Sequence, residues 1–127
     1  MSHDESSLGQ HQTIIFDHVI TNVGGYYNRH TGIFSSPVYG VYTFSWTLYC
    51  ISDGYIYSEI VVNSNAVGAM YCDGQGALSL RHTTGVVVVE INLGDVVYIR
   101  THPQDPVGGA IPSGTTYPSS FKGWKLY

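Results

Sequence analysis

The sequence has little charge and no long hydrophobic run, and each absence excludes a class of protein. Charged residues make up 11% of the 127 residues, and with only five lysines and arginines the formal net charge is −4. Nucleic-acid binding normally requires a basic patch, so we exclude a nucleic-acid partner. No apolar run approaches the length of about 18 residues that a spanning helix requires, so we expect no membrane insertion.

Enzyme signatures are also missing. The chain has no G-x-S-x-G, H-E-x-x-H, C-x-x-C, P-loop or dinucleotide-binding motif. Asp17 and His18 are adjacent, but neighbouring residues of a strand face opposite ways and cannot act together. We therefore predict that the protein is not an enzyme.

The sequence offers few candidate residues for metal binding or for disulfide formation. The two cysteines, Cys50 and Cys72, permit one bridge, but a buried free thiol behaves as a small hydrophobe. We expect both to be reduced and keep the bridge as the alternative. No two of the six histidines have metal-ligand spacing such as i, i+2 on a strand, and we interpret them as ordinary exposed side chains. They are His3, His11, His18, His30, His82 and His102.

Tyrosine and glycine are abundant, with 11 and 15 copies, and this composition is typical of sheets joined by tight turns. Residues 40–50, GVYTFSWTLYC, place an apolar side chain at every second position from Tyr42 to Cys50. Because side chains alternate across a strand, this pattern predicts one aromatic face packed against a second layer.

Short segments of this kind recur along the chain and predict an all-β sandwich or barrel with eight to ten strands. Turns are expected at 52–54, 63–65, 73–76 and 83–85. Residues 1–11 are polar and predict a flexible arm before one domain at 12–127. The predicted strands are 13–16, 18–22, 33–36, 40–51, 55–63, 66–72, 77–82, 86–93, 96–102 and 121–127.

The segment 86–93, VVVVEINL, is apolar on both predicted faces. Its inward residues are expected to be Val87, Val89, Ile91 and Leu93. Val86 and Val88 would face outward, with Val96 and Tyr98 on the same side. A strand that is apolar on both faces needs something packed on its outside, so we predict that the chain binds copies of itself.

Five segments, in the same order along the chain, resemble the globular head of complement C1q. Their sequences are most similar to those of the stand-alone C1q-domain proteins of molluscs. They are FDHVITN (16–22), 27–34, PVYGVYTFSW (37–46), LGDVVYIR (93–100) and SSFKGWKLY (119–127). The resemblance implies a ten-stranded jelly-roll β-sandwich related to tumour necrosis factor, a compact homotrimer and secretion. Framework roles fall on Phe16, Tyr27, Gly32, Phe34, Pro37, Gly40, Tyr42, Phe44, Gly94, Asp95, Phe121, Gly123 and Tyr127.

The chain also departs from the family pattern. No collagen-like stalk sequence is present, so stalk-mediated multimers are not predicted. Lys125 stands where the family usually has an apolar residue, and we expect it to loosen or redirect the last strand. Cys72 resembles one half of the disulfide of complement heads, but Tyr57 and Ser58 occupy the region of the other half.

Candidate ligand-binding residues are tyrosines in loops beside small polar groups, since sugars stack on aromatic rings and loops commonly carry binding residues. They are Tyr26 with Asn28 and Arg29, Asp53 with Tyr55, and Tyr117. The alternative is that these tyrosines serve packing. No cofactor is required, but Asp73 and Gln75 correspond to the apical calcium loop of complement heads and are weak Ca²⁺ candidates.

Together these features predict a non-enzymatic, soluble pattern-recognition lectin of innate immunity, which binds microbial or self glycans as a trimer. The first alternative is a signalling ligand for a protein receptor. The second is a metal-binding protein of extracellular fluid.

Overall fold

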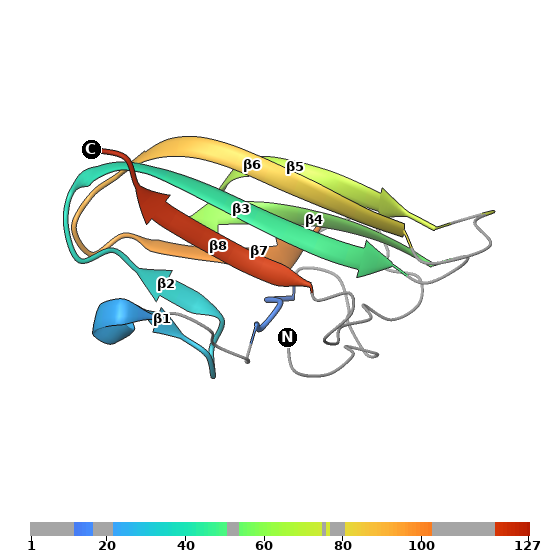
Figure 1. The fold of residues 1–127 in the computed structure, drawn as a ribbon, viewed down its shortest axis with the longest axis horizontal. Helices are drawn as coiled ribbons and strands as arrows, with labels where there is room; N and C mark the ends of the chain where they lie inside the picture. Colours follow the sequence, from blue (N-terminus) through green and yellow to red (C-terminus); the bar gives the residue numbers. More distant parts are fainter. Residues whose placement is uncertain (1–11, 17–21, 51–53, 75, 77–80, 103–118) are drawn as a thin grey trace.

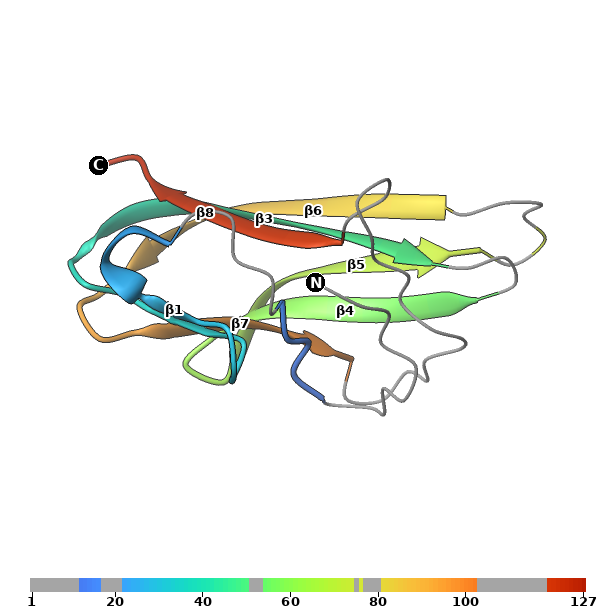
Figure 2. The same cartoon turned by 60° about the horizontal axis from the view of Figure 1, so that its bottom comes forward.

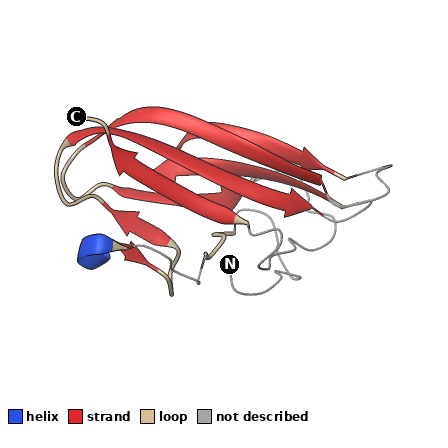
Figure 3. Ribbon diagram, viewed as in Figure 1, coloured by secondary structure: helices blue, strands red, loops and turns tan. Residues whose placement is uncertain are grey.

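The computed structural model describes residues 12–16, 22–50, 54–74, 76, 81–102 and 119–127, which form a sandwich of two antiparallel sheets (Figures 1 and 3). The described elements are η1 (Val23–Gly25), β1 (Tyr27–Asn28), β2 (Ile33–Ser35), β3 (Gly40–Cys50), β4 (Tyr55–Val62), β5 (Asn65–Asp73), β6 (Arg81–Ile91), β7 (Val96–Thr101) and β8 (Ser120–Lys125). One sheet has the order β1-β2-β7-β4-β5 and the other β6-β3-β8. Figure 2 shows the two layers edge-on. The all-β sandwich is therefore confirmed.

The core lies between the layers and is built largely from the inward face of β3. Its alternate residues Tyr42, Phe44, Trp46, Leu48 and Cys50 are all buried, as the period of two predicts. The opposite layer contributes apolar side chains from the same alternation. They include Ile56, Ile60, Met70, Val97 and Ile99.

Strand β6 is longer than the sequence predicts. The expected turn at 83–85 is wrong, because Arg81–Ile91 is one continuous strand paired with β3 along its whole length. Gly85 lies directly opposite Trp46, and a Cβ at Gly85 would come within 2.6 Å of the indole ring. The glycine is therefore present to accommodate the tryptophan ring, and it ends no strand.

Three further expectations concern the strand ends. Leu93 is exposed and does not join the core, because β6 ends at Ile91 and the chain turns there. The expected strand 13–16 is reduced to one isolated bridge, between Thr13 and Arg100. Strand β8 ends at Lys125, which pairs with Tyr42. The expected arm 1–11, residues 18–21 of the expected strand 18–22 and residues 77–80 of the expected strand 77–82 lie outside the described residues.

Two turns at one end of the sandwich are joined by side chains. Asn63 and Ser64 have positive φ and close the two-residue β4–β5 turn. The Asn63 Nδ2 donates to Asp95 Oδ1 at 2.8 Å, and the Asn92 amide donates to Asp95 Oδ2 at 2.8 Å. These two hydrogen bonds, in that order, lower the pKa of Asp95. The carboxylate thereby ties the β4–β5 turn to the β6–β7 turn.

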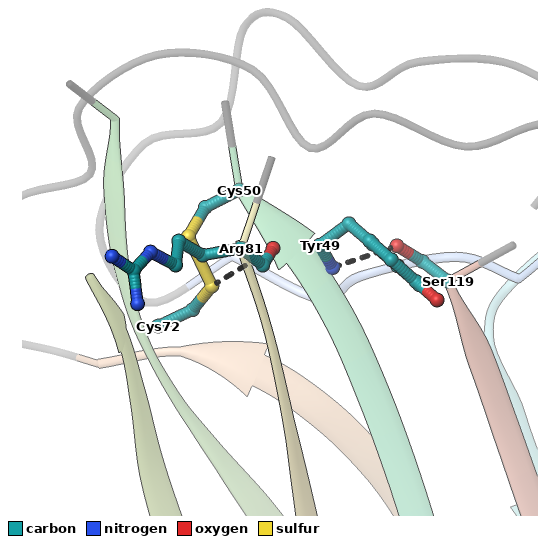
Figure 4. The surroundings of a disulfide bond; sticks show 5 residues. All are labelled: Tyr49, Cys50, Cys72, Arg81 and Ser119. Carbon is teal, nitrogen blue, oxygen red and sulfur yellow. Dashed lines mark hydrogen bonds between the residues drawn. A yellow bond between two sulfur atoms is a disulfide. The ribbon is translucent and has the colours of Figure 1, made fainter. Parts of the chain in front are cut away.

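The two cysteines form a disulfide, so the expectation of reduced thiols is wrong (Figure 4). Cys50 ends β3 and Cys72 lies near the end of β5, and both point into the core. The packing of the two sheets brings their Cα atoms to 6.2 Å, which is within the normal range for a bridge. The disulfide therefore links one sheet to the other.

Candidate functional site

The outer face of the three-stranded sheet exposes four large apolar side chains, with the charged Glu90 and Lys122 beside them on the same face. Val86 and Val88 of β6 are 61% and 64% exposed. In the register of the sheet, Val88 lies beside Thr43, which in turn lies beside Trp124 of β8. Leu126 follows β8 and donates its amide to Val41. We call the four exposed side chains Val86, Val88, Trp124 and Leu126 the apolar face.

Val96 and Tyr98 do not join this surface, so the prediction that they share a side with Val86 and Val88 is wrong. Both belong to β7, a strand of the other sheet. Their neighbours Val97 and Ile99 are fully buried, so Val96 and Tyr98 face outward from the five-stranded sheet. The turn between β6 and β7 carries the chain from one layer to the other, as the two sides of the sandwich in Figure 2 show.

The outer face of the five-stranded sheet carries a row of three rings across neighbouring strands. Tyr71 of β5 lies 5.6 Å from Tyr57 of β4, measured between ring centroids. The ring of His102, the residue after β7, lies 4.8 Å from that of Tyr57 on its other side. We call Tyr57, Tyr71 and His102 the aromatic row. Its central ring is half-buried between its neighbours, and Tyr71 is the more exposed end.

Two predicted site residues lie together beside this row. Tyr55 and Asp73 are direct partners in the β4–β5 register, one pair along from Tyr57 and Tyr71. Directly opposed residues of antiparallel strands project on the same face, so a sugar candidate and a calcium candidate become neighbours. Asp53 and Gln75, the other members of those two predicted sites, lie outside the described residues.

A buried ion pair lies on the other side of the aromatic row. The Arg100 Nε donates to Glu59 Oε1 at 2.5 Å, and both side chains are at most 10% exposed. Each charge compensates the other, as burial requires. Beside the pair, Val61 is completely buried although it is absent from the core between the sheets. The pair therefore presents no free charge to the rings.

The third predicted site is elsewhere. Tyr26 and Arg29 are exposed next to β1, which is separated from β4 by β2 and β7. Asn28 has a structural task, because its Oδ1 accepts hydrogen bonds from the amides of His30 and Thr31 in the β1–β2 turn. The structure does not bring these residues to Tyr55. Tyr117 lies outside the described residues.

Metal and membrane features are absent from the part of the chain that the structure describes. It contains no group of three or more histidine, cysteine, aspartate or glutamate side chains able to hold a metal ion. Two of the described histidines pack against tyrosine rings, His82 on Tyr49 and His102 on Tyr57. No helix within the described ranges is long and apolar enough to cross a membrane.

Sequence reasoning missed Tyr57, Tyr71 and His102 as site residues. The alternation of Tyr55, Tyr57 and Glu59 does place these side chains on one face of a strand. Their neighbours could not be inferred, because they depend on the pairing of β4 with β5 and β7. Trp124 and Leu126 were missed on the apolar face for the same reason.

Known proteins resemble the chain over nearly its whole length. A family model described as C1q domain matches residues 1–126. Complement C1q tumor necrosis factor-related protein 3 of Homo sapiens is 31% identical over 122 residues, which cover 93% of this chain and 46% of that protein. Multimerin-1 of Mus musculus is 32% identical over 123 residues, which cover 90% of this chain and 9% of that protein. The chain thus spans just under half the length of the first relative and a small part of the second.

Two solved structures share the fold. The globular domain of zebrafish complement 1qA protein superposes with a TM-score of 0.70 at 20% identity, over 98% of this chain and 94% of that one. The structure of Eiger TNF from S. frugiperda gives 0.63 at 14% identity, over 99% and 91%. The sandwich is therefore a jelly roll of the C1q and tumour necrosis factor type, and the chain belongs to the C1q domain family, a family of non-enzymatic domains.

Proposed function

We propose that the chain is an extracellular recognition module that forms a homotrimer through the apolar face and binds glycans of microbial surfaces in innate immunity. The observation that carries the proposal is the opposite character of the two outer faces. One presents Val86, Val88, Trp124 and Leu126 to solvent, and the other presents tyrosines beside polar side chains.

The apolar face supports self-association. One face of an antiparallel sheet can be exposed to water, but that face then normally carries polar side chains. Here two valines and a tryptophan are exposed on one face of the sheet, with Val88 and Trp124 on either side of the small residue Thr43. Large exposed apolar side chains gathered on one face and bordered by polar residues mark interaction surfaces. Members of the C1q and tumour necrosis factor families typically form trimers, so a second and third copy are the proposed partners.

Trimer formation would make weak sugar sites useful. Three sites on one particle bind a dense, repeated ligand with far higher avidity than one site does, without any new contact. Microbial polysaccharides present such repeats. A signalling ligand for a protein receptor would instead show a protein partner in a pull-down and no sugar affinity.

The disulfide supports an extracellular location. Structural disulfides form and persist in oxidising compartments and are rare in the cytosol. The bridge between Cys50 and Cys72 is completely enclosed in the core, so its role is structural.

A glycan array tests the function. The fluorescently labelled chain is applied with and without calcium, because Asp73 is the one carboxylate of the expected calcium loop that the structure describes. We expect binding to dense polysaccharide spots and at least about tenfold weaker binding by the monomeric variant Val88→Asp. Background signal on every spot in both conditions would contradict the proposal.

A further inference from the structure

We infer that a neutral pyranose unit of the glycan binds against Tyr71 on the aromatic row, with Asp73 accepting hydrogen bonds from its hydroxyl groups. This inference rests on the proposed function and assigns it a site on the five-stranded sheet. The site differs from the loop sites that the sequence indicates at Tyr26 and Tyr117.

The rings supply a flat apolar surface of fixed orientation. Tyr57 is held between Tyr71 and His102, with centroid distances of 5.6 and 4.8 Å. Tyr71 is inclined to Tyr57 by 47° and is 42% exposed, so part of its surface is open to solvent. Aromatic rings bind the C–H face of a pyranose, and tyrosine adds a hydroxyl that can stay in water. The loss of side-chain conformational entropy when a ligand binds these rings is small, because neighbouring rings already restrict their motion.

The polar groups lie where the hydroxyls of a stacked sugar would reach. Asp73 is two residues after Tyr71 on β5 and therefore on the same face, and Tyr55 lies opposite it. A carboxylate has about four lone-pair sites, so Asp73 can accept from a sugar in addition to any contact within the chain. His102, at the far end of the row, supplies an imidazole. This alternation of rings and hydrogen-bonding groups fits a sugar as the ligand better than it fits an apolar protein segment as the ligand.

The charges favour a neutral sugar. Asp73 is exposed on β5, and Arg100 of β7, on the far side of β4, is paired with Glu59. The whole chain carries a formal net charge of −4. We therefore expect an acidic sugar to bind less tightly than a neutral one, because its carboxylate would approach the carboxylate of Asp73 on a chain of net negative charge.

The position of the row agrees with threefold assembly. It lies on the sheet opposite the apolar face, so association through β6-β3-β8 leaves β4 and β5 on the outside of the particle (Figure 2). Each copy then presents one row to the ligand surface.

The test compares two tyrosines of nearly equal exposure. Tyr71 and Tyr26 are 42% and 45% exposed; Tyr71 lies on the edge strand β5, and Tyr26 directly precedes β1 at the opposite edge of the same sheet. Wild type, Tyr71→Ala, Tyr71→Phe, Asp73→Asn and Tyr26→Ala are each applied to surfaces coated with mannan, dextran, a β-glucan or polysialic acid. Binding is measured by biolayer interferometry, and the thermal midpoint and sedimentation of each variant verify its fold and assembly.

We expect wild type to bind a neutral surface more tightly than polysialic acid. Tyr71→Ala should weaken that binding roughly tenfold or more, the usual scale when an aromatic anchor is truncated. Asp73→Asn should also weaken it, whereas Tyr71→Phe and Tyr26→Ala should bind nearly as wild type does.

The outcomes separate the site from the function. Wild-type binding that survives Tyr71→Ala, or that is lost in Tyr26→Ala, overturns the aromatic row and leaves glycan recognition in place. Equal binding to polysialic acid overturns the role of Asp73. Failure of wild type on every surface overturns both the site and the proposed function.

Discussion

The two outer faces of the sandwich differ although the strands beneath them follow the same rule. In both sheets alternate residues fill the shared core. The outward residues of β6 and β8 include two exposed valines and a tryptophan, whereas β4, β5 and β7 with the following His102 carry tyrosines, the histidine and a paired charge. The inward residues therefore determine the fold, and the outward residues determine what each face can bind.

The largest expected effect comes from placing a charge on the apolar face. Val88→Asp would put three carboxylates into the interface of a trimer, where desolvation and mutual repulsion oppose burial. We expect the trimer to dissociate at least about 100-fold more readily, so that sedimentation at micromolar concentration shows monomers.

Val67→Asp is the matched control for this prediction. Val67 is 41% exposed on β5 of the other sheet. Its substitution should leave the assembly unchanged, because the proposed interface does not include β5. If Val67→Asp dissociates the assembly and Val88→Asp does not, the faces have been assigned the wrong way round.

Removal of the disulfide should have the next largest effect, because it detaches the sheets from each other at one end. Cys50 and Cys72 are 22 residues apart, and a crosslink of that span is expected to stabilise by about 3 kcal/mol. The double variant Cys50→Ala with Cys72→Ala should lose about that free energy of unfolding in a urea titration. An unchanged urea midpoint would show that the bridge contributes nothing to holding the layers together.

Gly85→Ala should cost about 1–3 kcal/mol, the range typical of overpacked cores. The added methyl group would meet the indole of Trp46, which is buried and donates its Nε1 hydrogen to Ser58 Oγ at 3.0 Å. The outer face is untouched, so stability should fall without loss of assembly. Thermal unfolding combined with sedimentation separates the two effects, and wild-type stability would mean that the indole has room to move.

The smallest effect concerns pH and the hydrogen bonds of Asp95 between the β4–β5 and β6–β7 turns. The pKa of Asp95 is lowered in the folded chain below its ordinary value of 3.8, first by Asn63 and then by the Asn92 amide. The contribution of Asp95 to the stability of the fold is therefore complete above pH 3.8, and it is lost as the pH falls through the lower pKa of the folded chain. We expect the thermal midpoint of Asp95→Asn to fall less than that of wild type between pH 5 and about 2.5.

Asn63→Ala provides the control for this pH effect, since it removes the principal hydrogen bond to Asp95. It should reduce the acid dependence in the same direction as Asp95→Asn. Identical acid profiles for all three proteins would show that the carboxylate does not link the turns measurably.

The sequence predicted what depends on one strand and failed where two strands meet. The period of two at 40–50 identifies the buried side of β3 from Tyr42 to Cys50. Gly85 was assigned to a turn because the ring that covers it belongs to Trp46, far away in the chain. The disulfide likewise depends on how β3 and β5 pack.

The candidate sites show the same division. Val86 and Val88 could be recognised as outward-facing from their own strand. Val96 and Tyr98 were placed beside them because no periodicity within a strand reveals that the chain changes sheets after Ile91. Tyr55 and Asp73 were each chosen for a different ligand, and only the β4–β5 register makes them neighbours.

The mass of the wild-type particle in solution tests the central claim most directly. The chain has a mass of 13.9 kDa. Sedimentation equilibrium at micromolar concentration should give three times that value, because the exposed side chains of the apolar face become buried between copies. A single species of 13.9 kDa, with Val86 and Val88 open to solvent, would contradict the account.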